Sequence, residues 1–369
     1  MNKGNQMKNI CSNCIGEEYL SSYIRKNGIL DECSYCEKQK KVLEFRKIID
    51  MIEDGLLYLY DDPVNGLGWE DGEYVEGTSK VQDSYDLFDE YFDGGKKSFI
   101  DLVSCFSDRL WCKKDFYDLD DSQESKYTWE SFKNLTKYKF RYFFNIKNYF
   151  SENDYSKYKN PYDILTEIMR ISKRIKLFTI LPKGTIIYRA REGKYLTNDE
   201  LCSPEPQQCT YSNRFSPAGI SMFYGSSDEK TCLAEIDRRN NVSIGKWEVM
   251  KDILIFDLTY KFHFSNNRYF YRKFPSIFDR ERREYYHDYK FILDFASDIS
   301  QIVIKNKNEN IDYVPTQIVT EYLKLNKKGL KGISYYSVVN SLKNYCLFLD
   351  KQQCKKETVI KMVDSFYVE

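Results

Sequence analysis

The chain has 369 residues, which is enough for two domains and a sizeable core. Lysine plus arginine equals aspartate plus glutamate at 56 each, so there is no overall basic field and nucleic acid is not an expected partner. No stretch approaches the roughly 18 consecutive apolar residues of a membrane span, and the N-terminus lacks the apolar segment of a secretory signal. We therefore expect neither membrane association nor export.

Four of the eleven cysteines form two Cys-x2-Cys pairs near the N-terminus, namely Cys11, Cys14, Cys33 and Cys36. Each pair can place two thiolates on one ion, and two pairs complete the tetrahedral four-sulfur shell of a structural zinc site. A redox pair is the alternative, but a redox Cys-x2-Cys would not need a second one. We predict a structural Zn²⁺ module over residues 1–40 and, from the odd cysteine count, a cytoplasmic location without a disulfide framework.

Residues 41–178 are predicted to form a helical accessory domain, because apolar residues recur there at helical spacing. The predicted helices are residues 17–28, 37–60, 84–95, 127–150 and 162–178, and the glycine- and aspartate-rich segment 61–79 is predicted as a loop.

The periodicity changes at Leu181, and residues 179–369 are predicted to form a mixed, sheet-rich domain. The predicted strands are 184–191, 220–225, 243–250, 252–260, 331–337, 345–349 and 357–363, and the predicted helices are a short one carrying Glu235, 291–303 and 316–326. Residues 264–290 are dense in charges and aromatics and are expected to be exposed. The whole chain is therefore assigned to the α+β class.

Three arginines surround a glycine- and proline-containing turn at residues 213–219. Arg189 and Arg191 stand two apart on a predicted strand and so share one of its faces. Together with Arg214 they could clamp a diphosphate through forked, charge-assisted hydrogen bonds. Surface salt bridges are the alternative for each of them. No phosphate-binding GxxxxGK[ST] or GxGxxG motif is present, which disfavours the ordinary nucleotide-binding folds.

Glu235 lies in a mostly apolar helical turn, where a carboxylate needs a partner or faces a cleft. A salt bridge to Arg238 or Arg239 is the alternative. Ser337 ends a predicted strand, where serine is commonly only a turn residue.

The chain has two histidines, His263 and His287. Arg282-x4-His287 matches the loose Arg-x4-6-His pattern of a ribonuclease superfamily, but two residue types at a permissive spacing in a charged segment are better explained by chance. So few histidines also give little support to a catalytic triad or a histidine-bound zinc hydrolase.

In this order and spacing the residues resemble the RES domain, a family named for its Arg, Glu and Ser, over about residues 181–350. The matching positions are Tyr188-Arg189, Asn213-Arg214-Phe215-x3-Gly219, Tyr224, Thr231-x2-Ala234-Glu235, Pro315-Thr316-Gln317 and Gly332-Ile333-x3-Ser337. The cysteine pairs followed by helices resemble the HEPN-related N-terminal region that accompanies some RES domains. The turn reads Asn-Arg-Phe-Ser, where toxin members of the family tend to show Gly-Arg-Trp-Asn.

The resemblance implies an ADP-ribosyltransferase-like core for residues 179–369 and an enzyme that cleaves the nicotinamide–ribose bond of NAD⁺ by hydrolysis or phosphorolysis. Such an enzyme would be a bacterial toxin or an anti-phage defence effector, with an antitoxin or a defence-system protein as partner, or a homodimer. One alternative is an ADP-ribosyltransferase that modifies a protein or nucleic acid. Another is an inactive, zinc-dependent binding protein.

The resemblance also implies a role for each site residue. Glu235 would stabilise the cation-like ribosyl carbon, as a carboxylate does in glycoside cleavage. Arg189 and Arg214 would hold the diphosphate with support from Arg191, and Tyr224 would orient the nicotinamide ribose. Ser337 would bind the ribose or its phosphate and should lie beside Arg189 and Glu235. The remaining NAD⁺-binding positions would be Tyr188, Asn213, Phe215 and Gln317.

Overall fold

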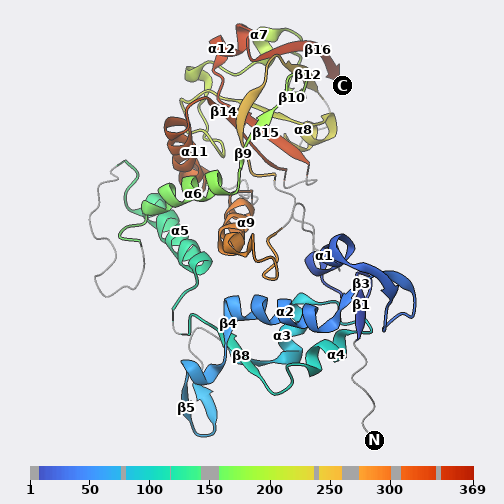
Figure 1. The fold of residues 1–369 in the computed structure, drawn as a ribbon. Helices are drawn as coiled ribbons and strands as arrows, with labels where there is room; N and C mark the ends of the chain where they lie inside the picture. The colour runs from blue at the N-terminus through green and yellow to red at the C-terminus, as the bar shows by residue number, and fades with distance from the viewer. Residues whose placement is uncertain are drawn as a thin grey trace, which may run out of the picture. The chain divides into compact units, whose positions relative to one another are not determined.

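The computed structural model describes residues 8–75, 80–116, 118–142, 158–236, 241–259, 274–300, 309–337 and 342–369. The chain divides into two compact units, whose elements are drawn in Figure 1. We call Met1–Asp121 with Lys273–His287 the cysteine unit, and Ser122–Arg272 with Asp288–Glu369 the sheet unit. The domain boundaries expected at residues 40 and 178 stay predictions.

The cysteine unit contains short strands and helices in alternation. These are β1 (Asn9–Cys11), α1 (Glu18–Asn27), β2 (Ile29–Glu32), β3 (Gln39–Glu44), α2 (Phe45–Leu59), β4 (Tyr60–Asp61), β5 (Gly68–Glu70), β6 (Glu73–Val75), β7 (Gln82–Asp83), α3 (Ser84–Tyr91), α4 (Phe99–Ser104) and β8 (Leu110–Lys113). They form the sheets β1-β3-β2 and β4-β8-β7 and the hairpin β5-β6.

The helix predicted over residues 37–60 is wrong in its first part, because residues 39–44 form strand β3. This strand lies between β1 and β2, and Val42 is buried while Lys41 is exposed. Backbone pairing on both sides outweighs the helical propensity of the lysine-rich sequence. The segment predicted as a loop contains the hairpin β5-β6.

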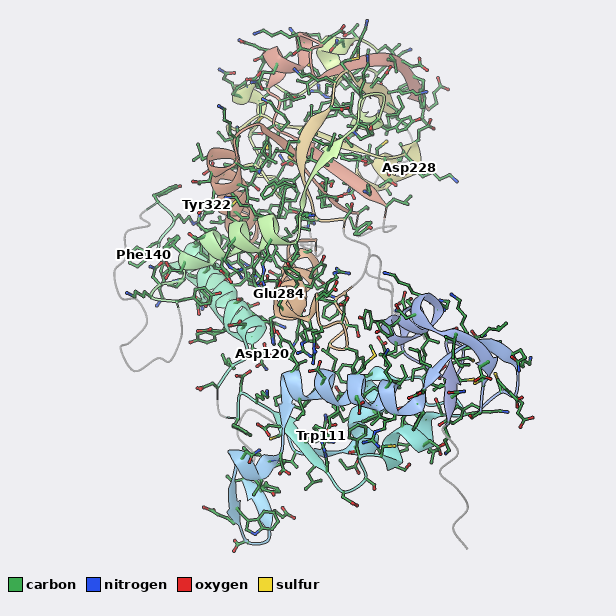
Figure 2. All side chains as sticks on the ribbon, viewed as in Figure 1. Trp111, Asp120, Phe140, Asp228, Glu284 and Tyr322 are labelled. Carbon is green, nitrogen blue, oxygen red and sulfur yellow. The ribbon has the colours of Figure 1, made fainter. Side chains whose placement is uncertain are left out.

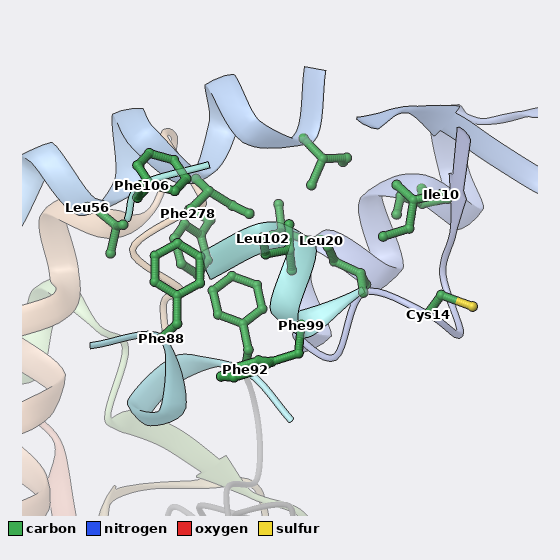
Figure 3. Packing of buried hydrophobic residues seen from close by; sticks show 14 of the residues in the cluster. Ile10, Cys14, Leu20, Leu56, Phe88, Phe92, Phe99, Leu102, Phe106 and Phe278 are labelled. Carbon is green, nitrogen blue, oxygen red and sulfur yellow. The ribbon is translucent and has the colours of Figure 1, made fainter. Parts of the chain in front are cut away.

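Aliphatic and aromatic side chains together form the core of the cysteine unit, as Figure 3 shows. Phe278 packs into this core with its ring 5.5 Å from that of Phe92. Gly55 of α2 makes room for it, because a Cβ there would lie 2.4 Å from the Phe278 ring. The prediction of an exposed segment is therefore wrong for Ile277 and Phe278, which are both buried. Burial of a Phe side chain stabilises the fold by about 1.5–3 kcal/mol, which explains why this residue leaves the solvent.

The sheet unit is a mixed α+β structure. Its elements, some of which begin at the unit boundaries, are α5 (Asp121–Tyr138), α6 (Asp163–Arg174), β9 (Phe178–Leu181), β10 (Ile186–Glu192), α7 (Asn198–Leu201), β11 (Phe223–Ser226), α8 (Glu229–Glu235), β12 (Val242–Val249), β13 (Ile253–Asp257), α9 (Tyr286–Ser300), α10 (Glu309–Asp312), α11 (Val314–Asn326), β14 (Leu330–Tyr336), β15 (Lys343–Leu347), α12 (Lys351–Lys355) and β16 (Ile360–Val368). Each predicted strand has a counterpart, and the predicted α+β class is confirmed at this level.

The strands of the sheet unit are joined in the order β16-β12-β10-β11-β15-β14-β13-β9. β10 pairs with β12 along its length, but it pairs with β11 at one position only, Tyr188 with Ser226. The backbone pairing between β10 and β11 is therefore confined to one end of β11.

The two faces of this sheet carry different apolar clusters, because side chains alternate along each strand. One face, which we call the thiol face, holds Ile187, Phe223 and Trp247 packed with Cys202 and Cys354 near α7 and α12. The other face, which we call the α8 face, carries a cluster that Tyr188 and Ala190 of β10 and Cys232 of α8 share with β12.

None of the described helices has the length and apolarity that crossing a bilayer requires. Some sequence predictions lie outside the described residues, namely those for 76–79, 143–150, 260, 264–273 and 301–303 and for Arg238, Arg239 and His263.

Candidate active site

Glu235 is the last residue of α8, and the start of this helix is firmly capped. The Asp228 carboxylate accepts the backbone N–H of Thr231 at 3.0 Å, and Asp228 is labelled in Figure 2. A carboxylate at a helix start is favourable because it satisfies free N–H groups. The cap thus orients a helix of less than two turns that ends at Glu235.

Two buried side chains from distant parts of the chain meet the Glu235 carboxylate. The Ser337 hydroxyl donates to Oε1 at 2.6 Å, and the Asn344 amide donates to the same oxygen at 2.7 Å. Ser337 and Asn344 are each only 2% exposed, whereas the Glu235 residue is exposed. The Oε1 atom of Glu235 is therefore fixed by two buried donors, while the residue itself is exposed to solvent.

Arg214 lies between two tyrosine rings on the same side of the sheet. Its guanidinium carbon is 5.9 Å from the ring centre of Tyr313 and 5.8 Å from that of Tyr335, and it donates to the Ile299 carbonyl. Tyr335 is the strand partner of Asn344. Burial raises the pKa of Tyr335, with Glu235 acting in the same direction and Arg214 in the opposite one. Arg214 and Glu235 are thus neighbours of one tyrosine.

Other residues of the turn 213–219 also contact Tyr335 and the nearby helix α11. We call Arg214, Tyr313 and Tyr335 the arginine–tyrosine wall. Phe215 is buried, with its ring edge-on to Tyr335 at 4.8 Å. Asn213 and Ser216 form an isolated bridge, and the Gln317 amide donates to the Asn213 carbonyl at 2.8 Å. Gln317 therefore holds the turn rather than facing a free space.

Tyr224 of β11 also points to this face, because its strand partner Cys346 lies two residues after Asn344 in β15. Its hydroxyl is 2.9 Å from that of Ser216. Burial raises the pKa of Tyr224 well above its usual value. The hydroxyl is therefore a neutral hydrogen-bonding group and not a base.

Arg189 and Arg191 have their guanidinium groups bonded to backbone. Arg189 lies over the Phe223 ring at 5.2 Å, on the thiol face, and donates to the Tyr224 carbonyl at 2.8 Å. Its Nε is buried without a partner among the described residues, and burial lowers the pKa of this guanidinium. Arg191 donates to the Glu200 carbonyl and stacks on Tyr195.

The expected group of Arg189, Glu235 and Ser337 is thus only partly assembled within the described residues. Ser337 bonds Glu235, but neither of them has a contact to Arg189 there. Tyr188 packs on the α8 face. The sequence analysis missed Asn344, because the strand that contains it was predicted to begin at residue 345. The available signal was a polar residue two positions before Cys346, which places both side chains on one face of the strand.

The four cysteines of the cysteine unit form one group, with all four sulfur atoms within 4.8 Å of one another. The separations include 3.6 Å for Cys11–Cys14, 3.7 Å for Cys11–Cys36 and 3.9 Å for Cys14–Cys33. Zn–S bonds of about 2.3 Å in a tetrahedron place sulfurs about 3.8 Å apart. The donor type and the spacing both fit a zinc ion.

His287 belongs to the cysteine unit, whereas Glu235 belongs to the sheet unit. Its Nδ1 lies 3.5 Å from the carboxylate of Asp120, which is labelled in Figure 2, and Arg283 rather than Arg282 pairs with Asp54 at 2.7 Å. These contacts add no support to the ribonuclease alternative.

Two family models match the chain. A model described as HEPN/RES N-terminal domain 1 matches residues 26–149, and a model described as RES domain matches residues 186–365. No curated protein matches. The crystal structure of the M. tuberculosis MbcT–MbcA toxin–antitoxin complex contains a chain with 13% identity and a TM-score of 0.31, over 54% of this chain and 90% of that one. A likeness of this size carries no argument by itself.

Proposed function

This chain belongs to the RES-domain proteins that carry a HEPN/RES N-terminal domain, and we propose that it cleaves the nicotinamide–ribose bond of NAD⁺. The observation that carries the proposal is the contact of Glu235 with Ser337 and Asn344 next to the arginine–tyrosine wall. Ser337 and Asn344 lie 102 and 109 residues from Glu235 in the sequence, and both donate to its exposed carboxylate. Two buried donors hold this exposed carboxylate in one orientation, which supports a chemical role for it.

The chemistry of the bond suits this arrangement. Nicotinamide leaves readily because its departure neutralises the ring, and the ribosyl carbon it leaves behind is cation-like. A fixed carboxylate stabilises this charge more in the transition state than in the ground state, which accelerates the step. Attack by water then yields ADP-ribose and a proton, and attack by phosphate yields the phosphorylated sugar. We assign the carboxylate role to Glu235, and a ribose contact to Ser337.

Arg214 is the arginine that we assign to the diphosphate of NAD⁺. It belongs to the arginine–tyrosine wall next to Glu235, and tyrosine rings support its planar guanidinium. Such a fork suits phosphate oxygens. Arg189 and Arg191 lie on the thiol face, opposite to the face that carries Asn344 and Tyr335. We therefore propose that they hold the framework, with Arg189 supporting the strand that carries Tyr224. Tyr224 would orient the nicotinamide ribose.

Nicotinamide release from NAD⁺ by the purified protein tests the proposal. We expect release by the wild type and its loss in Glu235→Gln, with Ser243→Ala as a control because Ser243 is a buried residue of β12 that bonds the 193–195 segment. Parallel reactions with and without phosphate separate hydrolysis from phosphorolysis, and labelled NAD⁺ with cell extract reveals transfer to a macromolecule. Absence of release in all three reactions would reject the activity.

We further propose that this chain acts as a toxin or a defence effector, because cleavage of NAD⁺ would deplete the cell of this cofactor. Induced expression in bacteria should lower cellular NAD⁺ and stop growth, and Glu235→Gln should do neither at equal protein level. Growth arrest by both forms would show that the effect does not come from NAD⁺ cleavage.

For the cysteine unit we propose a structural Zn²⁺ held by Cys11, Cys14, Cys33 and Cys36. The sulfur separations support this assignment, and three of the four cysteines are buried. Four thiolates fill a tetrahedral shell and leave no position for a substrate, so the ion would contribute to folding and not to NAD⁺ cleavage.

A further inference from the structure

We propose that Asn344, fixed in turn by Ser226, is the residue that positions Glu235 for NAD⁺ cleavage. Asn344 is a positioning residue and not a catalytic one, because it acts on Glu235 and not on the substrate. The inference rests on the function proposed above and assigns a role to two residues outside the family motif.

The contacts form a chain across two strands and one helix. The Ser226 hydroxyl of β11 donates to Asn344 Oδ1 at 2.7 Å, and Asn344 Nδ2 of β15 donates to Glu235 Oε1 at 2.7 Å. Ser226 and Asn344 are direct partners in the β11–β15 register, so their side chains share one face. They are 3% and 2% exposed, respectively. This series of hydrogen bonds is therefore anchored on paired, buried positions of the sheet.

The order of donors and acceptors makes the geometry directional. An asparagine amide has one acceptor end and one donor end. Because Ser226 occupies the acceptor end, the NH₂ end must point to Glu235. Aspartate at this position would have no donor and would face Glu235 with a second negative charge. Only an amide can satisfy both neighbours.

Both donors to Glu235 use the same oxygen. Ser337 and Asn344 converge on Oε1, and no donor among the described residues bonds Oε2. Two bonds on one oxygen fix the plane of the carboxylate and leave Oε2 as the oxygen that can face the ribosyl carbon. Such preorganisation lowers the barrier because no reorientation is needed when charge develops. Ser337 lies just after the last residue of β14, whereas Asn344 is inside β15 and gives the stiffer support.

Nicotinamide release by a set of matched variants tests this role. Loss of a residue that orients a functional group from behind typically costs about 10- to 100-fold. We expect Asn344→Asp to lower kcat by about this factor with little change in KM, and Ser226→Ala to lower it less. Ser226→Thr keeps the hydroxyl and should retain most of the wild-type kcat, and Ser243→Ala should leave it unchanged. An unchanged kcat in Asn344→Asp, or a change confined to KM, would overturn the proposal.

A stability cycle separates failure of this inference from failure of the proposed function, because it needs no activity. Asn344→Asp places two carboxylates together and should lower the thermal midpoint, whereas adding Glu235→Gln supplies an amide that can donate to the new carboxylate. We expect the double variant to be more stable than Asn344→Asp alone. Additive effects of the two substitutions would show that the residues are not coupled, whatever the wild type does with NAD⁺.

Discussion

The four-cysteine group and the Glu235 group are both clusters of functional side chains, but they differ in how they are closed. The cysteine sulfurs face one another within 4.8 Å, and three of the four residues are buried. Glu235 is exposed, with its supporting donors buried beneath it. Four thiolates around a zinc ion fill its coordination shell and leave no position for a substrate, so such a site stabilises the fold. A carboxylate that is hydrogen-bonded on one side and exposed on the other can act on a ligand.

The two clusters also differ in sequence range. The cysteine pairs have three-residue spacings and lie in one short segment, so the chain brings them together locally. Ser337 and Asn344 lie 102 and 109 residues from Glu235, so the Glu235 cluster exists only when the sheet has formed. The comparison therefore predicts that damage to the first cluster affects folding and that damage to the second affects chemistry.

Removal of zinc should have the largest effect. Structural zinc sites contribute about 10–16 kcal/mol of apparent binding free energy, which is folding free energy. We expect one Zn²⁺ per chain by metal analysis, and loss of the cooperative unfolding transition of the cysteine unit after chelation or in Cys33→Ser. Cys105→Ser is the matched control, because Cys105 is exposed and outside the group. Unchanged folding together with lost NAD⁺ cleavage would give the first cluster a chemical role and break the comparison.

Glu235→Gln should have the next largest effect, this time on chemistry alone. The change keeps the size of the side chain but removes the charge that stabilises the ribosyl cation. Loss of one preorganised electrostatic group costs about 100- to 1000-fold in kcat. We expect this loss in nicotinamide release, with a thermal midpoint close to that of the wild type. A large drop in the midpoint would mean that the second cluster also serves folding.

The arginines sharpen the comparison within the sheet unit. Arg214→Ala should raise KM for NAD⁺ by about 10- to 100-fold, since a charged hydrogen bond is worth about 1.5–3 kcal/mol. Arg189→Ala should mainly lower the thermal midpoint, because it loses the bond to the Tyr224 carbonyl and the contact with Phe223. Steady-state kinetics and thermal unfolding of both variants decide this. If Arg189→Ala raised KM for NAD⁺ without changing the thermal midpoint, Arg189 would be assigned to diphosphate binding and not to the framework.

Tyr224→Phe should have the smallest effect. It removes the bond to Ser216, worth about 0.5–1.5 kcal/mol, and keeps the ring. An acid whose pKa is raised stays protonated up to that pKa, so burial keeps the Tyr224 hydroxyl neutral throughout the range in which the enzyme is assayed. The shape of the pH profile of nicotinamide release should therefore be the same in Tyr224→Phe as in the wild type. A lost basic limb would show that Tyr224 ionises.

Local patterns in the sequence were sufficient for most elements and for the group of four cysteines. The strands β10, β12 and β14 were located to within a few residues, and β10 by its two-residue alternation. The same reasoning failed for residues 39–44, where Val42 is buried only because β1 and β2 pair on both sides. It also failed for Phe278, whose charged neighbours hide a side chain that fills the core of the cysteine unit.

By itself the sequence determined the cysteine group, the α+β class and the resemblance that singled out Arg189, Tyr224, Arg214, Glu235 and Ser337. These depend on spacing and residue type, which a linear chain displays directly. Only the tertiary structure decided that Asn344 supports Glu235 and that Arg189 bonds a backbone carbonyl. Which side chains meet across strands depends on register and on the point where β10 and β11 separate, and these are set by the packing of the whole sheet.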